Sequence, residues 1–363
     1  MTRAMPVDAV LAVTYRCNAR CAMCGIWASP PVPELEPAEF EKLPPTLRDV
    51  NLTGGEPFLR DDLPEVHAAV RRACPRAKTV ISTNGLLTER IVNFMTQMRL
   101  VEPGIGVAVS LDGPAEVHDK LRGEPGTYDR ALATVRGLQK EGFTNLRLAF
   151  TATPANADCM GTVYALARKM RVEFTCAFEH ASEHYFHRRA RAGAGLSPHT
   201  NGGGLKPALH TAYAGGLASD ELRAQLQQVM RAELRSFSPK RWGRAYFMNG
   251  IWQFVSGEGR PLPCRAGRDF FFMDPSGNIF ACNAMPFKMG SLKERTFVEV
   301  WNSPDAKGAR ASATGCANGC WMVCTARTAI LRARWRALRW ALRAKLMGLR
   351  LPPAADATGK VNA

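Results

Sequence analysis

The chain has 363 residues, of which 46% are hydrophobic, so it can bury a full core and does not need the staples of a peptide-sized scaffold. Its formal net charge of +16 points to anionic partners, but eight basic residues and no acidic one fall between Thr325 and Pro352, so the excess is concentrated in one terminal segment. No apolar run approaches the roughly eighteen residues of a membrane span, and the N-terminus lacks the features of a secretion signal, so we expect a cytoplasmic protein.

Strand-like and helix-like segments alternate through the first half of the chain. Apolar or β-branched runs lie at residues 9–14, 49–53, 79–83, 105–111, 146–151 and 172–178. Helical periodicity covers residues 62–74, 87–98, 128–141 and 159–170. This alternation predicts parallel βαβ units in an α/β fold. Six such units favour a partial (β/α)6 TIM-like barrel with its active face at the carboxyl ends of the strands.

The second half has a different composition. We expect residues 1–187 to form the barrel and residues 188–261 to form a glycine-rich loop followed by two linking helices at 219–237 and 240–254. Residues 262–326 then form a small cysteine-rich domain, and residues 327–363 form a basic amphipathic tail.

Three of the eleven cysteines follow the first predicted strand. Cys17, Cys21 and Cys24 have the spacing C-x3-C-x2-C. In a reducing compartment, clustered cysteines favour metal ligands over disulfides. Three thiolates on one loop can bind three irons of a four-iron cluster and leave the fourth iron open to a chelating amino-acid group. The alternatives are a zinc site, which would require a fourth ligand nearby, or buried thiols.

This spacing resembles the signature of the radical S-adenosylmethionine (SAM) superfamily. The resemblance implies a [4Fe-4S] cluster whose open iron binds the amino and carboxylate groups of SAM. It also implies a reductant such as flavodoxin or ferredoxin, whose electron releases methionine and a 5'-deoxyadenosyl radical. Met23 would lie beside the adenine.

Polar and glycine-rich motifs end the next three predicted strands. The second strand ends in GGEP, the third in STNG and the fourth in SLDG. Each motif alone is a turn signal, but together they suit one ligand site at the barrel mouth. The resemblance implies that the GGE segment holds the SAM amino group and that the other motifs reach its carboxylate and ribose. The expected cofactor-binding residues are Met23, Gly54, Gly55, Glu56, Pro57, Ser82, Asn84, Ser110 and Asp112.

Five further cysteines lie in the predicted cysteine-rich domain. Cys264 and Cys282 flank a DPSG turn that predicts a hairpin, and Cys316, Cys320 and Cys324 have a spacing that suits one side of a helical turn. The segment resembles the SPASM/Twitch extension of radical SAM enzymes, although a full SPASM extension has seven cysteines. The five cysteines of this segment suit one auxiliary iron-sulfur cluster. We expect the first four as ligands and leave Cys324 open, with a zinc ribbon as the alternative.

The tail and a histidine-rich segment give weaker signals. His180, His184 and His187 share one face of a possible helix, where they would contact a polar substrate or simply cover the surface. In the tail, an apolar stripe that includes Trp335 adjoins a basic stripe. This pattern suits either peripheral contact with the inner membrane surface or a helix docked on the barrel through its leucines. We expect no nucleic-acid partner, because no binding fold accompanies the charge.

These features predict an enzyme that abstracts hydrogen from a substrate carbon and oxidises or epimerises the substrate. The basic tail favours a sugar-like or lipid-linked small molecule. A ribosomal peptide maturase is the alternative, and a non-catalytic iron-sulfur electron carrier is the hypothesis from another class. A carrier would not need the GGE segment and the polar strand ends.

Overall fold

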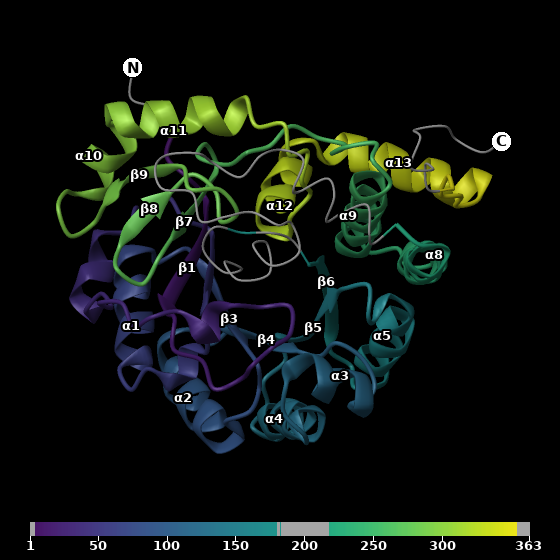
Figure 1. Ribbon diagram of the computed structural model, residues 1–363, viewed down its shortest axis with the longest axis horizontal. Coiled ribbons are helices and arrows are strands. Elements are labelled where there is room, and N and C mark those ends of the chain that lie inside the picture. Colours follow the sequence, from purple (N-terminus) through teal and green to yellow (C-terminus); the bar gives the residue numbers. More distant parts are fainter. Residues whose placement is uncertain (1–3, 180–181, 183–217, 354–363) are drawn as a thin grey trace.

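Residues 4–179, 182 and 218–353 are described by a computed structural model (Figure 1). Within them, one sheet has the strand order β6-β5-β4-β3-β2-β1-β7-β8-β9. The first six strands pair in parallel as predicted, and they form a partial barrel. They are β1 (Asp8–Thr14), β2 (Asp49–Gly54), β3 (Lys78–Thr83), β4 (Gly106–Ser110), β5 (Leu146–Ala152) and β6 (Glu173–Phe178).

Register and alternation decide which side chains face the helices. Leu11, Leu52, Ile81, Val107 and Leu146 are aligned across the first five strands, and all are buried. Because side chains alternate along a strand, the neighbouring positions face the other side of the sheet. The helices that follow the strands lie outside them (Figure 1). They are α1 (Leu63–Ala73), α2 (Thr88–Val101), α3 (Ala115–Arg122), α4 (Thr127–Lys140) and α5 (Met160–Lys169).

Helix α3 was not predicted from the sequence. It has eight residues, and Gly123 ends it in the left-handed conformation at φ 78°. Four short 3₁₀ helices within the described residues were also not predicted, because one or two turns carry too little periodicity. They span Ile26–Ala28, Pro37–Lys42, Pro57–Leu59 and Ala157–Cys159. The predicted linking helices are α8 (Asp220–Leu234) and α9 (Pro239–Val255).

The cysteine-rich segment continues the barrel sheet. Strand β7 (Phe270–Met273) is wholly buried and pairs in parallel with β1, and β8 (Asn278–Phe280) and β9 (Lys288–Ser291) follow antiparallel. The turn before β8 is the predicted hairpin, with Gly277 at φ 82°. Helices α10 (Phe297–Asn302) and α11 (Pro304–Thr314) complete this region. The cysteine-rich segment is therefore built directly on the first barrel strand.

The last two helices are α12 (Val323–Arg332) and α13 (Arg334–Met347). Helix α12 contacts β1 and β7. Its Arg327 pairs with Asp8 (Nη2 to Oδ1, 2.5 Å) and with Asp49 (Nη1 to Oδ1, 3.2 Å). Burial raises the pKa of Asp8 to about 6, although Arg327 opposes that rise. The expected domain boundary at residue 326 lies inside this helix.

The predicted helical turn through the last three cysteines is wrong. Cys316 and Cys320 lie in a loop, and α12 begins only at Val323. Gly319 lies in this loop at φ 59°, a conformation that ends helical geometry. His180, His184 and His187, and the glycine-rich loop after them, lie outside the described residues. No helix that the structure describes has the length and apolarity needed to span a membrane.

Candidate functional site

The cysteine loop leaves β1 and is held against the end of β2 by backbone contacts. Gly55 N donates to Thr14 O, and Glu56 N donates to Arg16 O, both at 2.8 Å. A Cβ at Gly54 would lie 2.0 Å from Thr14 O, and one at Gly55 would lie 2.2 Å from Arg16 O. Both glycines are therefore required by the close approach of the two chains.

Glu56 connects the ends of β2 and β3. Its carboxylate is buried and accepts hydrogen bonds from Thr83 Oγ1 (2.8 Å), Asn84 N (2.8 Å) and Phe58 N (3.2 Å). Burial raises the pKa of Glu56 to about 7, and the three donors oppose that rise. A carboxylate has about four acceptor sites, so one remains for a further donor such as an amine.

Asn84 and Ser82 also join neighbouring segments at this end of the sheet. Asn84 Nδ2 donates to Asn18 Oδ1 in the cysteine loop (2.8 Å), and the Ser82 hydroxyl bonds to the side-chain amide of Asn51 on β2. Met23 is buried in a small apolar cluster with Ala19, Cys21, Leu86 and Leu121. Pro57 starts the 3₁₀ turn after Glu56, and Ser110 ends β4 half-buried. Of the predicted residues, Glu56 and Asn84 therefore contact the cysteine loop and Met23 lies within it, while Ser82 contacts β2 and Ser110 lies at the end of β4.

Burial controls the protonation of the loop thiols. It raises the pKa of Cys17 to about 12 and that of Cys24 to about 11, and the neighbouring Cys21 sulfur adds to both rises. Backbone amides near Cys17 and Cys24 favour the thiolates and oppose these rises. Thiols in such a setting remain neutral at pH 7 unless a metal displaces the proton. A metal group bound here would therefore have to displace the thiol protons.

Asp112 has a different environment from the one expected of a SAM ligand. It is fully buried, and its Oδ1 accepts from Thr151 N at 2.9 Å. Its Oδ2 accepts from Arg122 Nε (2.7 Å) and lies 2.5 Å from Arg122 Nη2. Arg122 Nη1 in turn lies 3.6 Å from Cys21 Sγ. Asp112 therefore orients Arg122 through Oδ2, while its Oδ1 accepts from the backbone of β5.

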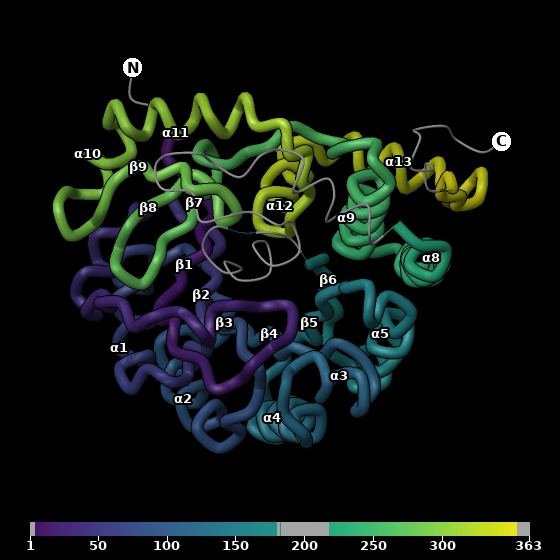
Figure 2. Tube along the Cα trace, in the orientation of Figure 1, coloured from purple at the N-terminus to yellow at the C-terminus, as the bar shows by residue number. Residues whose placement is uncertain are grey.

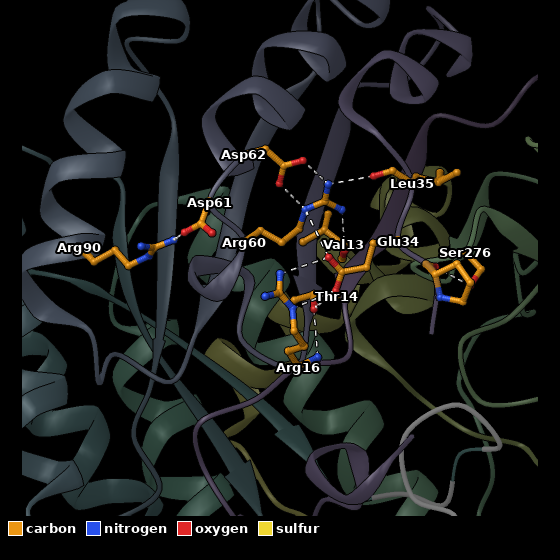
Figure 3. A network of polar contacts seen from close by, with 11 residues as sticks. Val13, Thr14, Arg16, Glu34, Leu35, Arg60, Asp61, Asp62, Arg90 and Ser276 are labelled. Atoms are coloured by element: carbon orange, nitrogen blue, oxygen red, sulfur yellow. Dashed lines mark hydrogen bonds and ion pairs between the residues drawn. The ribbon is translucent and has the colours of Figure 1, made fainter. Parts of the chain in front are cut away.

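A polar network supports the other side of the cysteine loop (Figure 3). Arg60 is almost fully buried and donates to Val13 O and to Leu35 O, both at 2.9 Å. It also pairs with Asp62, with Nη2 2.6 Å from Oδ2. Glu34 accepts from Arg16 at 3.2 Å and from the Thr14 hydroxyl. These contacts fix the point where the loop leaves β1.

A cavity of about 350 Å³ lies within the barrel. Strands β1 to β6 line one side of it, mainly with small side chains such as Ala108, Ala149 and Ala177. Trp321, Met322, Val323 and Cys324 also line it, together with Asn283 and two arginines, Arg147 of β5 and Arg327 of α12. Ser82, near the carboxyl end of β3, and Cys324, in the cysteine-rich segment, both line the cavity.

The five C-terminal cysteines divide into four and one. Cys264, Cys282 and Cys316 all raise the pKa of the buried Cys320, after the larger effect of burial. Amide nitrogens of Ala266 and Ala284 lie 3.5 Å and 3.3 Å from the Cys264 and Cys282 sulfurs. The Cys282 sulfur also raises the pKa of Cys324, after the larger effect of burial, but the Cys324 thiol donates to Asn283 Oδ1 at 3.4 Å and lines the cavity.

The arrangement of these thiols bears on which metal group they suit. Among the residues described, no three His, Cys, Asp or Glu side chains converge on a single-ion position. A four-iron cluster attaches each thiolate to a different iron, so its ligands surround a volume rather than a point. The two amide groups beside Cys264 and Cys282 suit thiolate charge.

Several residues at the site were not singled out from the sequence. Asn18, Asn51, Arg122 and His118 are polar groups without a recognisable motif. His118 Nδ1 accepts from Asp112 N at 3.0 Å, and burial lowers the pKa of this imidazole to about 4. Its place on α3, directly after SLDG, is the one signal that could have identified it.

Known proteins match both halves of the chain. The radical SAM superfamily matches residues 11–154, and the iron-sulfur cluster-binding SPASM domain matches residues 264–325. Fe-coproporphyrin III synthase of Methanosarcina barkeri is 34% identical over 174 residues, which cover 46% of this chain and 42% of that protein. Mycofactocin maturase MftC of Mycolicibacterium smegmatis is 27% identical across 87% of this chain and 78% of its own length.

Solved structures share the fold. SuiB of Streptococcus suis bound to S-adenosylmethionine has a TM-score of 0.57 at 15% identity, over 87% of this chain and 72% of SuiB. The protein anSMEcpe with bound AdoMet has a TM-score of 0.55 at 14% identity, over 93% of this chain and all of that one. The chain therefore belongs to the radical SAM superfamily of enzymes, with a [4Fe-4S] cluster and SAM as cofactors and a C-terminal SPASM domain for auxiliary iron-sulfur.

Proposed function

We propose that this enzyme cleaves SAM reductively and abstracts a hydrogen atom from a carbon of a substrate held in the barrel cavity. The observation that carries the proposal is the cavity itself, which joins Ser82 at the strand ends to Cys324 in the cysteine-rich segment. A substrate there lies between the two cysteine groups. The protein binds and orients its partners, while the cofactors supply the radical and electron-transfer chemistry.

The proposed ligands of the SAM-binding cluster are Cys17, Cys21 and Cys24. Their place on one loop, held against the end of β2, and the apolar cluster around Cys21 and Met23 support this assignment. For the auxiliary cluster we propose Cys264, Cys282, Cys316 and Cys320, because the first three all act electrostatically on Cys320, whereas the Cys324 thiol, on which Cys282 also acts, donates to Asn283. Cys324 is assigned to the cavity wall.

SAM would be held by the same strand ends. We propose that Glu56 accepts from the SAM amine through its remaining acceptor site and that Gly54, Gly55 and Pro57 shape the backbone around it. Ser82, Asn84 and Ser110 provide further polar groups, and Met23 provides apolar contact. Asp112 is a positioning residue for Arg122, which it holds through Oδ2. Like Glu56 it accepts three hydrogen bonds and keeps one acceptor site, which we assign to SAM.

The cavity volume bears on the substrate. A volume of about 350 Å³ is at the lower end of ligand pockets and suits a sugar ring or one amino-acid side chain more than a tetrapyrrole. Arg147 and Arg327 give it positive charge. The names of MftC and of SuiB, which was solved with its precursor peptide SuiA, support the peptide alternative, and the basic tail supports a lipid-linked sugar.

A cavity-filling variant tests the proposal. Ala177→Phe should leave the slow SAM cleavage seen without substrate unchanged, because Ala177 lies in the cavity wall and outside the proposed SAM contacts. Anaerobic extract of the source cells, with candidate peptides and sugars as separate additions, should stimulate 5'-deoxyadenosine formation in the wild type and not in the variant. Thr162→Phe on the exposed surface of α5 is the matched control. Equal stimulation in both variants would place the substrate elsewhere.

A further inference from the structure

Helix α13 packs on the protein through its small residues. Ala337 and Ala341 are buried, and Trp340 stacks edge-on against Tyr246 of α9, with ring centroids 5.5 Å apart. Helix α13 therefore docks on α9, as one of the two sequence-based alternatives expected. Of the expected leucines, Leu338 is half-buried and Leu349, just beyond the helix, is buried, whereas Leu342 and Leu346 are exposed.

The opposite face of α13 is apolar and exposed. Trp335 is 70% exposed, Leu342 45% and Leu346 86%. Their spacing of seven and four residues aligns them along one side of the helix. Leu331 at the end of α12 is 63% exposed, and Met347 is 80% exposed. We call this set, Leu331, Trp335, Leu342, Leu346 and Met347, the tail stripe.

Basic side chains flank the tail stripe. Helical geometry places Arg339 and Arg343 on one side of it and Arg334 and Lys345 on the other. Arg327 and Arg332 of α12 are already paired with aspartates. By contrast, no described acidic residue forms an ion pair with Arg334, Arg339 or Arg343. Lys345 Nζ donates to Ser236 O at 3.3 Å and lies over the rings of Phe237 and Trp242. The charge of the three arginines is therefore available to an outside partner.

An apolar groove adjoins the tail stripe. It has a volume of about 670 Å³ and lies between α9, α12 and α13. Trp242, Phe247 and Leu338 line it together with Leu331 and Trp335 of the stripe. The exposed ring of Phe237 lies nearby, with Lys345 Nζ 4.8 Å from its centroid. The apolar surface is therefore wider than one helix.

We propose that the tail stripe docks the enzyme onto a membrane surface rich in anionic phospholipid. Apolar side chains with cations on both sides match a headgroup layer, in which Trp and Leu enter the acyl boundary and Arg and Lys contact phosphate. A second copy of this chain fits less well, because two such faces would oppose their arginines. The inference is independent of the proposed reaction.

Vesicle sedimentation of the reconstituted holoenzyme tests the proposal. The wild type should bind vesicles of phosphatidylglycerol and phosphatidylcholine far more than pure phosphatidylcholine, and salt should weaken this binding. Arg339→Gln with Arg343→Gln should weaken it about thirtyfold. Leu342→Gln with Leu346→Gln should weaken it on the order of tenfold or more.

Two matched controls separate this site from general charge and polarity. Arg136→Gln with Lys140→Gln removes two exposed cations from α4, and Leu100→Gln removes an exposed leucine from α2, on the far side of the molecule (Figure 2). Both should bind like the wild type. Equal loss in the α13 and α4 variants, or binding indifferent to lipid charge, would overturn the proposal. The proposal would also be overturned if the wild type were a dimer and the double substitution Leu342→Gln with Leu346→Gln converted it to a monomer. SAM cleavage should be unchanged in every variant, which would show that loss of vesicle binding does not come from loss of the proposed reaction.

Discussion

Arg122 lies beside Cys21, with its Nη1 atom 3.6 Å from the cysteine sulfur, and Asp112 orients it there. The guanidinium is buried, and the carboxylate of Asp112 and the sulfur of Cys21 raise its pKa despite that burial. The cation is therefore fixed against a proposed cluster ligand. A positive charge in this position favours the more negative, reduced state of a cluster.

Removing this cation should make the cluster harder to reduce. We expect Arg122→Gln combined with Asp112→Asn to lower the midpoint potential of the SAM-binding cluster by tens of millivolts. The second substitution avoids a buried unpaired carboxylate. A redox titration followed by electron paramagnetic resonance measures the shift, with Lys120→Gln on the same helix as the control. An unchanged potential would show that Arg122 has only a structural role.

Glu56→Gln should weaken SAM binding by about tenfold or more, because the amide replaces an ionised acceptor. It also turns an NH2 group toward one of three existing donors, which should cost about 1–3 kcal/mol of unfolding free energy. Isothermal titration of SAM and chemical denaturation measure the two effects. Glu65→Gln on the surface of α1 is the matched control. Wild-type affinity in the Glu56 variant would remove Glu56 from the SAM site.

His118 should make the protein sensitive to acid. Burial lowers its folded pKa to about 4 from an ordinary value of 6.5, so the unfolded chain takes up the proton first as the pH falls. The stability gained from the neutral imidazole is complete above pH 6.5 and is lost as the pH falls toward 4, by about 3 kcal/mol in all. His118→Asn keeps an acceptor for Asp112 N but does not titrate, so it should lose less stability over this range. Denaturation curves at several pH values compare the two proteins, and parallel losses would contradict this account.

Among the C-terminal cysteines, substitution of the proposed cluster ligands should lower the iron content, and substitution of Cys324 should not. Cys264→Ala with Cys282→Ala should remove the auxiliary cluster, about half of the iron, and leave the SAM-binding cluster in place. Cys324→Ala should retain all the iron, because its thiol donates to Asn283 instead. Iron analysis and Mössbauer spectra distinguish the outcomes. Loss of iron in the Cys324 variant would make Cys324 a ligand.

The sequence predicted the sheet well because its signals are local. The apolar runs of β1 to β6 and the DPSG turn before β8 can each be recognised from a few consecutive residues. The loop of Cys316 and Cys320 was predicted as a helical turn because spacing alone does not reveal that Gly319 interrupts it. The pairing of Asp112 with Arg122 depends on the placement of α3, an eight-residue helix whose periodicity is too brief to read. The apolar and basic stripes of the tail could be recognised from the sequence. The face of α13 that packs inward could not, because it is set by contact with α9, which is distant in sequence.

The most direct test of the central claim is 5'-deoxyadenosine formation by the anaerobically reconstituted protein under strong reductant. The wild type should contain about eight irons from two four-iron clusters and produce deoxyadenosine and methionine from SAM. Replacing Cys17, Cys21 and Cys24 by Ala should remove about half of the iron and abolish both products. Cys74→Ala, at a buried thiol that donates to Pro44 O, controls for the loss of a cysteine. No deoxyadenosine from the wild type, or undiminished iron in the triple variant, would contradict the claim and favour a non-catalytic electron carrier.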